Sequence, residues 1–464
     1  MVADEGLLPT LLIPPKECSI LYYIFPLPVC LLTFLYAKWQ RFDARTIALL
    51  FVAVSLYYFH FYHTRWDQFT IDAQSHAGYV SYIAQHDALP TQAVNSATRH
   101  PPAFYIVAAG LYKLAQYTHS DPLQTARHVS MMCFIVFILM GISMLRLLLP
   151  QQTSGYYAGV LLLLFWPIGV TMGARLMCDI LLYATEAFTL YALAGWCQKN
   201  DPLNLSKAFI GSGLCVLAKS TGLLMLLLTV GALAIMLYEY RRKWRELLNP
   251  PLLLSISFML VCCLLTFGRE QHWTTWLIIS GTLAPVRLFW LDTFGSFNVF
   301  LFAFDTNSGL SSGMFWNMLL HSLMLGNGDI MWKAVYIPIL LNVLWLVILI
   351  YLVEGLIRFG GVLIKDRSCI LLWVFCLIMI GAMVFMRIRL GNPQYADARY
   401  IYPVVIAVAL FFGRIIDLNQ QAGRLRLYRL GMAVAFSFLL LSPTLFFIQY
   451  PINFSVTQAS VDEK

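Results

Sequence analysis

The stretch KAFIGSGLCVLAKSTGLLMLLLTVGALAIMLY, residues 207–238, is almost continuously apolar and is interrupted by Lys219. A helix needs about 20 apolar residues to cross the hydrocarbon core of a bilayer, so this block is too long for one helix. We therefore predict two membrane helices that meet at Lys219. A lysine at such a place is either functional, because burying its charge is costly, or it extends its ammonium group to the membrane surface.

Apolar runs of similar length recur along the chain, which has 464 residues, 60% of them hydrophobic and only 12% charged. A soluble domain carries roughly twice that charged fraction. We predict an all-α polytopic membrane protein with about twelve transmembrane helices in a single domain. Acidic residues precede the first run, so it is expected to be a retained helix. Besides the two helices of 207–238, the candidate spans lie near 18–37, 46–63, 127–149, 155–172, 178–197, 250–267, 334–355, 369–386, 401–418 and 430–448.

The basic residues indicate an orientation. Just over half of the 31 lysines and arginines fall on one side of the predicted helices, mainly in the dense clusters 38–45, 238–246, 358–367 and 413–429. Basic residues in short loops mark the inner side of a membrane. We therefore predict that both termini face outward.

Two outer segments, about 64–126 and about 268–333, are then too long to be simple connectors. Both contain short apolar pieces, such as PPAFYIVAAGLYKLAQY at 101–117 and FWNMLLHSLML at 315–325. Pieces of this length are typical of interfacial helices that lie along a membrane surface. We predict a helical platform whose outer vestibule is covered by these two segments.

Asp72 and His76 lie in the first outer segment, in the sequence IDAQSH (71–76). If residues 72–84 are helical, the two side chains lie one turn apart on the same face. A carboxylate beside an imidazole can accept a proton or hold a metal ion or a phosphate. Taken alone, Asp72 could equally be a solvated loop residue.

Further charged residues are predicted to face the same side. Arg99 and His100 precede Pro101-Pro102, which mark the start of a helix, where a phosphate could bind; the alternative is a plain helix-entry turn. Asp179 ends a very short loop that begins at Arg175, and a charge pair there could also merely anchor helix ends. A short outer loop is expected to be poor in arginine, yet the segment RIRLGNPQYADARYIYP (387–403) supplies Arg387, Asp397, Arg399 and Tyr400.

A carboxylate with several cations suits one kind of chemistry. A base activates a hydroxyl or an amine while the cations bind a leaving phosphate. A lipid-phosphate substrate would place its tail between the helices and its head in the vestibule.

Several stretches resemble, in order, the GT-C fold glycosyltransferases. DAQSHAGYVSYIAQHDALP (72–90) and HPPAFYIVAAGLYKL (100–114) resemble their first outer loop, with its acidic residue and its "PPLYY"-like motif. MCDILLYATEAFTLYALAGW (177–196), GSGLCVLAKSTGLLMLLL (211–228) and QYADARYIYPVVIAVAL (394–410) resemble their later landmarks. The nearest group comprises the protein mannosyltransferases, the lipid A aminoarabinose transferases and the bacterial lipopolysaccharide-sugar transferases, which use polyprenyl-phosphate sugars.

The resemblance implies that Asp72 is the catalytic base, helped by His76, in a transfer that inverts the anomeric centre. It implies that Asp179 marks a second acidic position and that Lys219 and Arg399 contact the lipid-linked phosphate. The implied partners are a polyprenyl- or dolichyl-phosphate sugar donor, a lipid, glycan or protein acceptor, and membrane lipids, but no nucleic acid. The implied location is a bacterial cytoplasmic membrane, with the site facing the periplasm.

The sequence departs from the family pattern in three places. Many relatives carry a second acid directly after the first, where this chain has Ala73. We therefore expect no metal site in this loop and no cofactor. The helix near 18–37 is additional, and the short tail after the last predicted helix leaves no room for a soluble C-terminal domain.

Two other functions remain open from the sequence. One is a polysaccharide polymerase, which would also use outer arginines and lipid-linked sugars. The other is a transporter or flippase of lipid-linked saccharides. Transporters usually show internal repeats and ionisable groups near the membrane midplane, whereas here the charges gather at helix ends and no repeat is visible.

The orientation can be tested by labelling. A cysteine introduced at Asn95 should react with a membrane-impermeant thiol reagent added from outside, because the first long segment is predicted to face outward. A cysteine at Gln420, in a predicted inner loop, should react only after permeabilisation. The reverse pattern of labelling would show that the orientation is wrong.

Overall fold

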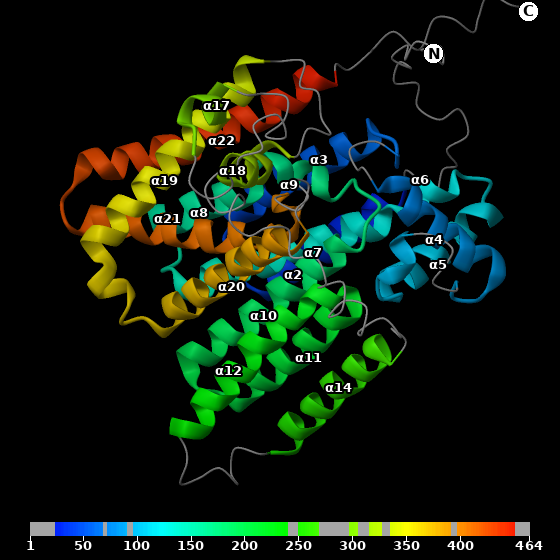
Figure 1. Cartoon of the computed structure of the whole chain (residues 1–464). Helices are drawn as coiled ribbons and strands as arrows, with labels where there is room; N and C mark the ends of the chain where they lie inside the picture. The colour runs from blue at the N-terminus through cyan, green and yellow to red at the C-terminus, as the bar shows by residue number, and fades with distance from the viewer. Residues whose placement is uncertain are drawn as a thin grey trace, which may run out of the picture.

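The computed structural model describes residues 24–67, 72–90, 96–239, 249–268, 297–304, 315–326, 335–390 and 397–450, and all regular secondary structure in these ranges is helical. Figure 1 shows the helices packed around one another. In chain order they are α2 (Pro26–Trp39), α3 (Ala44–Tyr62), α4 (Ala73–His86), η1 (Ser96–Arg99), α5 (Ala103–Tyr117), α6 (Pro122–Ala126), α7 (His128–Leu148), α8 (Ser154–Leu164), α9 (Pro167–Met172), α10 (Asp179–Lys199), α11 (Pro202–Ala218), η2 (Ser220–Gly222), α12 (Leu223–Glu239), α14 (Pro250–Phe267), α17 (Val299–Phe304), α18 (Phe315–Leu325), α19 (Tyr336–Leu363), α20 (Arg367–Leu390), η5 (Ala398–Ile401), α21 (Val404–Gln421) and α22 (Leu425–Gln449).

The lengths and compositions of these helices confirm the prediction of a multi-pass membrane protein. Within the described ranges, nine helical segments are long and apolar enough to cross a membrane. The predicted count of about twelve is not confirmed, because α2, α8 and α11 are each shorter than 18 residues. The nine segments are Ala44–Tyr62, Pro122–Leu148, Asp179–Lys199, Ser220–Glu239, Pro250–Phe267, Tyr336–Leu363, Arg367–Met386, Val404–Gln421 and Leu425–Gln449.

The helix break at Lys219 is present where the sequence predicts it. Helix α11 ends at Ala218, and Lys219 takes an extended conformation with φ −161° and ψ 145°. The 3-10 turn η2 follows before α12 begins at Leu223. The break lets Lys219 leave the helical path, so its side chain can reach a neighbouring helix.

A second break was not predicted. The expected single helix 155–172 is wrong, because α8 ends at Leu164 and α9 begins at Pro167. A proline has no N–H to continue a helix and forces the preceding residue toward an extended conformation. Trp166 accordingly has ψ 120°, and its Nε1 donates to the carbonyl oxygen of Leu323 at 2.6 Å. The break therefore anchors α18.

The first outer segment, named for the side on which it is predicted to lie, runs between α3 and the span that begins at Pro122, so it is slightly shorter than the predicted 64–126. Helices α4 and α5 pack together within it and lie at one end of the molecule, away from α12 and α14 (Figure 1). They share a small apolar core that includes Tyr79, Tyr105 and Ala108. Of the second predicted segment, 268–333, only α17 and α18 lie among the described residues. The placement of both segments along a membrane surface stays a prediction.

A buried arginine fixes the chain just before the Asp72 loop. Arg127 is fully buried and donates to the carbonyl oxygens of Phe61 and Thr64, at 2.8 Å each. These carbonyl groups belong to the end of α3, which has no further helical partners for them. Arg127 therefore joins the end of α3 to the start of α7.

Helices α8 and α21 approach one another backbone to backbone. A Cβ added at Gly155 would fall on the carbonyl oxygen of Gly413, and one added at Gly413 would fall on that of Gly155. At the same contact Asp417 accepts hydrogen bonds from the backbone N–H of Gly155 and from the Thr153 hydroxyl, both at 2.8 Å. Small residues permit this kind of close helix packing in membranes.

We predict that Gly155→Ala destabilises the protein by about 1–3 kcal/mol, because the new methyl group meets backbone that cannot move aside. The control is Gly231→Ala in α12, where an added Cβ meets no atom within 4 Å. Thermal unfolding in detergent should show a lower midpoint for Gly155→Ala only. Equal midpoints for both variants would contradict the close packing.

Candidate functional site

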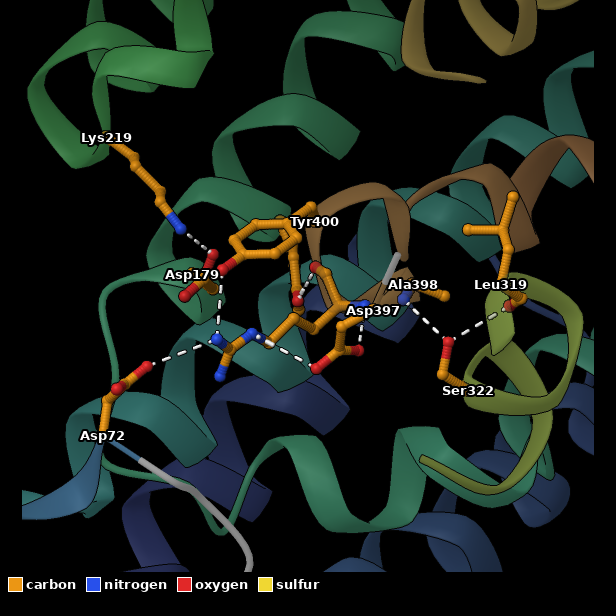
Figure 2. Close-up of polar contacts among 10 residues, drawn as sticks. Asp72, Asp179, Lys219, Leu319, Ser322, Asp397, Ala398 and Tyr400 are labelled. Atoms are coloured by element: carbon orange, nitrogen blue, oxygen red, sulfur yellow. Dashed lines mark hydrogen bonds and ion pairs between the residues drawn. The ribbon is translucent and has the colours of Figure 1, made fainter. Parts of the chain in front are cut away.

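Arg399 connects the first outer segment to the C-terminal helices. It lies in η5, just before α21, and its side chain is 9% exposed. Its Nη2 atom lies 3.3 Å from Oδ2 of Asp72, and its Nε atom lies 3.3 Å from Oδ2 of Asp397 (Figure 2). Asp397 also accepts a hydrogen bond from the backbone N–H of Arg399 at 2.9 Å. Asp397 therefore fixes the arginine, and the arginine reaches Asp72.

Lys219 and Asp179 form the second ion pair of the site. The Lys219 ammonium donates a hydrogen bond to the Asp179 carboxylate, and the two side chains are 7% and 5% exposed (Figure 2). Burial alone would lower the pKa of Lys219, but the adjacent Asp179 carboxylate raises it above its ordinary value. The buried lysine is therefore charged at neutral pH.

Tyr400 lies between the two cations. The Lys219 ammonium is 4.8 Å from the centre of its ring, and the Arg399 guanidinium carbon is 5.0 Å from it. The Tyr400 hydroxyl also accepts a hydrogen bond from Arg399 Nη2 at 3.0 Å. An aromatic face attracts a cation, so Tyr400 helps to hold both positive charges in one place.

Asp72 differs from the other two carboxylates in its exposure. Its side chain is 46% exposed, whereas those of Asp179 and Asp397 are 5% and 6% exposed. It directly precedes α4, so the stretch 72–84 considered in the sequence is indeed largely helical. Of these three carboxylates, Asp72 is the one that an external molecule can reach.

His76 lies one turn after Asp72, and its backbone N–H donates to the Asp72 carbonyl oxygen at 3.1 Å. Its ring, however, has another partner, because Nδ1 lies 2.7 Å from the Tyr105 hydroxyl. The His100 ring is nearly parallel to it, with centroids 6.0 Å apart. Burial lowers the pKa of His76 to about 4 and that of His100 to about 3. Both imidazoles are therefore neutral at neutral pH.

Not every predicted site residue can be placed. The side chains of Arg99 and Arg387 lie outside the described part of the structure. The structure brings together Asp72, His76, His100, Asp179, Lys219, Asp397, Arg399 and Tyr400. Among the described residues, no three His, Cys, Asp or Glu side chains gather in a way that could hold a metal ion.

Three supporting residues escaped the sequence analysis. Tyr105 contacts His76, the Tyr183 hydroxyl donates to the carbonyl oxygen of Arg399, and Ser322 Oγ accepts from the backbone N–H of Ala398 at 2.9 Å. Ser322 lies on α18, so the second outer segment also supports the site (Figure 2). Of the three residues, only Tyr105 belongs to a motif that is visible in the sequence, because it ends PPAFY. Tyr183 and Ser322 lie in largely apolar helices that carry other polar residues as well, so nothing in the sequence singles them out.

The site thus combines an accessible carboxylate, two buried cations and two neutral imidazoles. Cations held in a poorly solvated place bind phosphate strongly, and a carboxylate can take a proton from a nucleophile. Comparison of the sequence with known protein families gives a match. Residues 99–267 match the family described as dolichyl-phosphate-mannose-protein mannosyltransferase. The matched residues are just over a third of the chain, and over this stretch the chain is similar to membrane glycosyltransferases.

The match confirms the resemblance to the GT-C glycosyltransferases that depend on lipid-phosphate sugars. No curated protein and no solved structure matches the chain. The matched residues include His100, Asp179 and Lys219, whereas Asp72 and Arg399 lie outside them. For these two residues the argument rests on the geometry of the site.

The buried histidines predict a pH dependence of stability. Because the pKa of His100 is lower in the folded protein than the ordinary value of about 6.5, the unfolded state takes up a proton first as the pH falls. The stabilisation by His100 is complete above about pH 6.5 and is lost progressively as the pH falls toward 3. His100→Gln removes one such group, so its unfolding free energy should fall less steeply, by up to about 1.4 kcal/mol per pH unit. Denaturant unfolding between pH 7 and pH 5 measures this slope, and identical slopes for variant and parent would contradict the assignment.

Proposed function

We propose that the protein transfers a sugar from a polyprenyl- or dolichyl-phosphate donor to a lipid, glycan or protein acceptor on the outer face of the membrane. The observation that carries this proposal is the contact between the exposed carboxylate of Asp72 and the buried guanidinium of Arg399. The contact supports the proposal because a carboxylate that can accept a proton lies beside a cation that can bind a phosphate. The family match supports sugar transfer from a lipid phosphate rather than transport.

In the proposed reaction Asp72 is the general base. It removes a proton from the hydroxyl or amine of the acceptor while that atom forms a bond to the anomeric carbon. The bond between the anomeric carbon and the phosphate oxygen breaks, and its electron pair leaves with the polyprenyl phosphate. One direct displacement of this kind inverts the anomeric centre. Asp72 ends the step protonated.

Arg399 and Lys219 stabilise the leaving phosphate. Their charges are held by Asp397 and Asp179, which are buried and orient the cations without facing the solvent. Donors fixed in advance stabilise developing charge well, because they need little rearrangement during the reaction. Since Arg399 contacts Asp72 at 3.3 Å, an incoming phosphate competes with Asp72 for the same guanidinium.

We predict that Asp72→Asn lowers the transfer rate by about 10²–10⁴-fold, because an amide cannot take the proton of the acceptor. The matched control is Asp67→Asn, which removes the same charge from the same segment but from a carboxylate that pairs with Arg65. The assay follows transfer of labelled mannose from a polyprenyl phosphate, with membrane insertion and thermal midpoint measured alongside. Transfer by Asp72→Asn at the parental rate would remove Asp72 from the role of base.

A further inference from the structure

Tyr105 is a fully buried tyrosine of α5 whose hydroxyl lies 2.7 Å from Nδ1 of His76. Its ring stacks on Tyr79, with centroids 4.1 Å apart, and lies nearly parallel to the His76 ring at 5.8 Å. The thiol of Cys178 lies beside the same hydroxyl. The hydroxyl is therefore held between one nitrogen and one sulfur.

The direction of the hydrogen bond with His76 follows from the acceptor strengths. A hydroxyl has one proton, and an imidazole nitrogen accepts it much better than a thiol sulfur does. Burial raises the pKa of Cys178 to about 12, so the thiol stays protonated and is a weaker acceptor than the imidazole nitrogen. Tyr105 therefore donates to Nδ1 of His76. A neutral imidazole that accepts at Nδ1 carries its own proton on Nε2.

We propose that Tyr105 is a positioning residue that holds His76 in the tautomer protonated on Nε2, and that this N–H donates to a phosphate oxygen of the lipid-linked donor. The second half of this inference rests on the proposed function. The first half concerns the protein alone.

The surroundings of His76 favour a phosphate oxygen as the acceptor of this bond. Nε2 has no hydrogen-bond partner among the described residues. Four charged groups act electrostatically on the ring: the carboxylates of Asp72 and Asp179 and the cations Lys219 and Arg399. Each carboxylate already contacts one of the cations. A phosphate oxygen that binds Lys219 and Arg399 would therefore lie close to the neutral Nε2–H of His76 and can accept its hydrogen bond.

The tautomer can be measured directly in the full-length protein by ¹⁵N NMR of the histidine rings in detergent. The His76 signals are assigned by their loss in His76→Gln. In the parent we expect Nδ1 to be unprotonated and Nε2 to be protonated. Tyr105→Phe keeps the ring but removes the donor, so both tautomers should be populated. A parent protonated on Nδ1, or a Tyr105→Phe spectrum identical to the parent's, would overturn the positioning role.

The phosphate contact is tested with a short-chain polyprenyl phosphate that carries no sugar. Loss of one hydrogen bond to a charged group corresponds to about tenfold weaker binding, and this loss is expected for His76→Ala and Tyr105→Phe. His76→Gln retains an N–H donor near the position of Nε2 and should bind more tightly than His76→Ala. The corresponding polyprenol has no phosphate, and its binding should not change. Equal binding of the phosphate by the Gln and Ala variants would overturn the donor role.

Tyr57→Phe is the control for a merely structural effect. Tyr57 is equally buried, and its hydroxyl donates to the Leu164 carbonyl oxygen at 2.6 Å, within the bundle. It should lower the thermal midpoint without weakening binding of the phosphate, and weakening as large as for Tyr105→Phe would contradict a local role. Neither measurement requires sugar transfer. If Asp72→Asn were fully active, the base assignment would fail while the Tyr105 inference could still stand.

Discussion

The site depends on one buried guanidinium that must keep its anionic partners. Removing a charge from water costs several kcal/mol, and an ion pair compensates for this only when its geometry is good. Arg399 meets that requirement with Asp397, two residues away, and with Asp72, which lies 327 residues away in the chain. The contact with Asp72 brings the first outer segment onto the C-terminal helices. Without it, the exposed carboxylate and the buried guanidinium would not face the same space.

The remaining groups of the site are positioned by irregular backbone at the ends of helices. In a membrane, backbone N–H and C=O groups that leave a helix need other partners inside the protein. The Trp166 Nε1–H and the Tyr183 hydroxyl donate to the carbonyl oxygens of Leu323 and Arg399, respectively. The Ser322 hydroxyl oxygen accepts from the backbone N–H of Ala398. The helix break at Lys219 lets its side chain reach Asp179. The residues at these helix breaks thus bring the groups of the site together.

The sequence predicted what depends on local composition. Apolar length located most of the long helices, and the lysine within residues 207–238 located a real break. Rare charges in an apolar chain marked Asp72, Asp179, Lys219 and Arg399, which the structure brings together. The partners could not be predicted in the same way. Asp72 and His76 are neighbours in sequence, yet their side chains contact Arg399 and Tyr105, because packing between distant helices decides which groups meet.

The pairing of Asp72 with Arg399 has a chemical consequence in the proposed reaction. The donor is a phosphodiester with about one negative charge, whereas the released polyprenyl phosphate carries up to two. Asp72 loses its own charge in the same step, when it takes the proton of the acceptor. A neutral carboxyl group binds a guanidinium less strongly than a carboxylate does. Arg399 is therefore released toward the phosphate as the phosphate becomes more negative, so that the proton transfer and the departure of the leaving group assist each other.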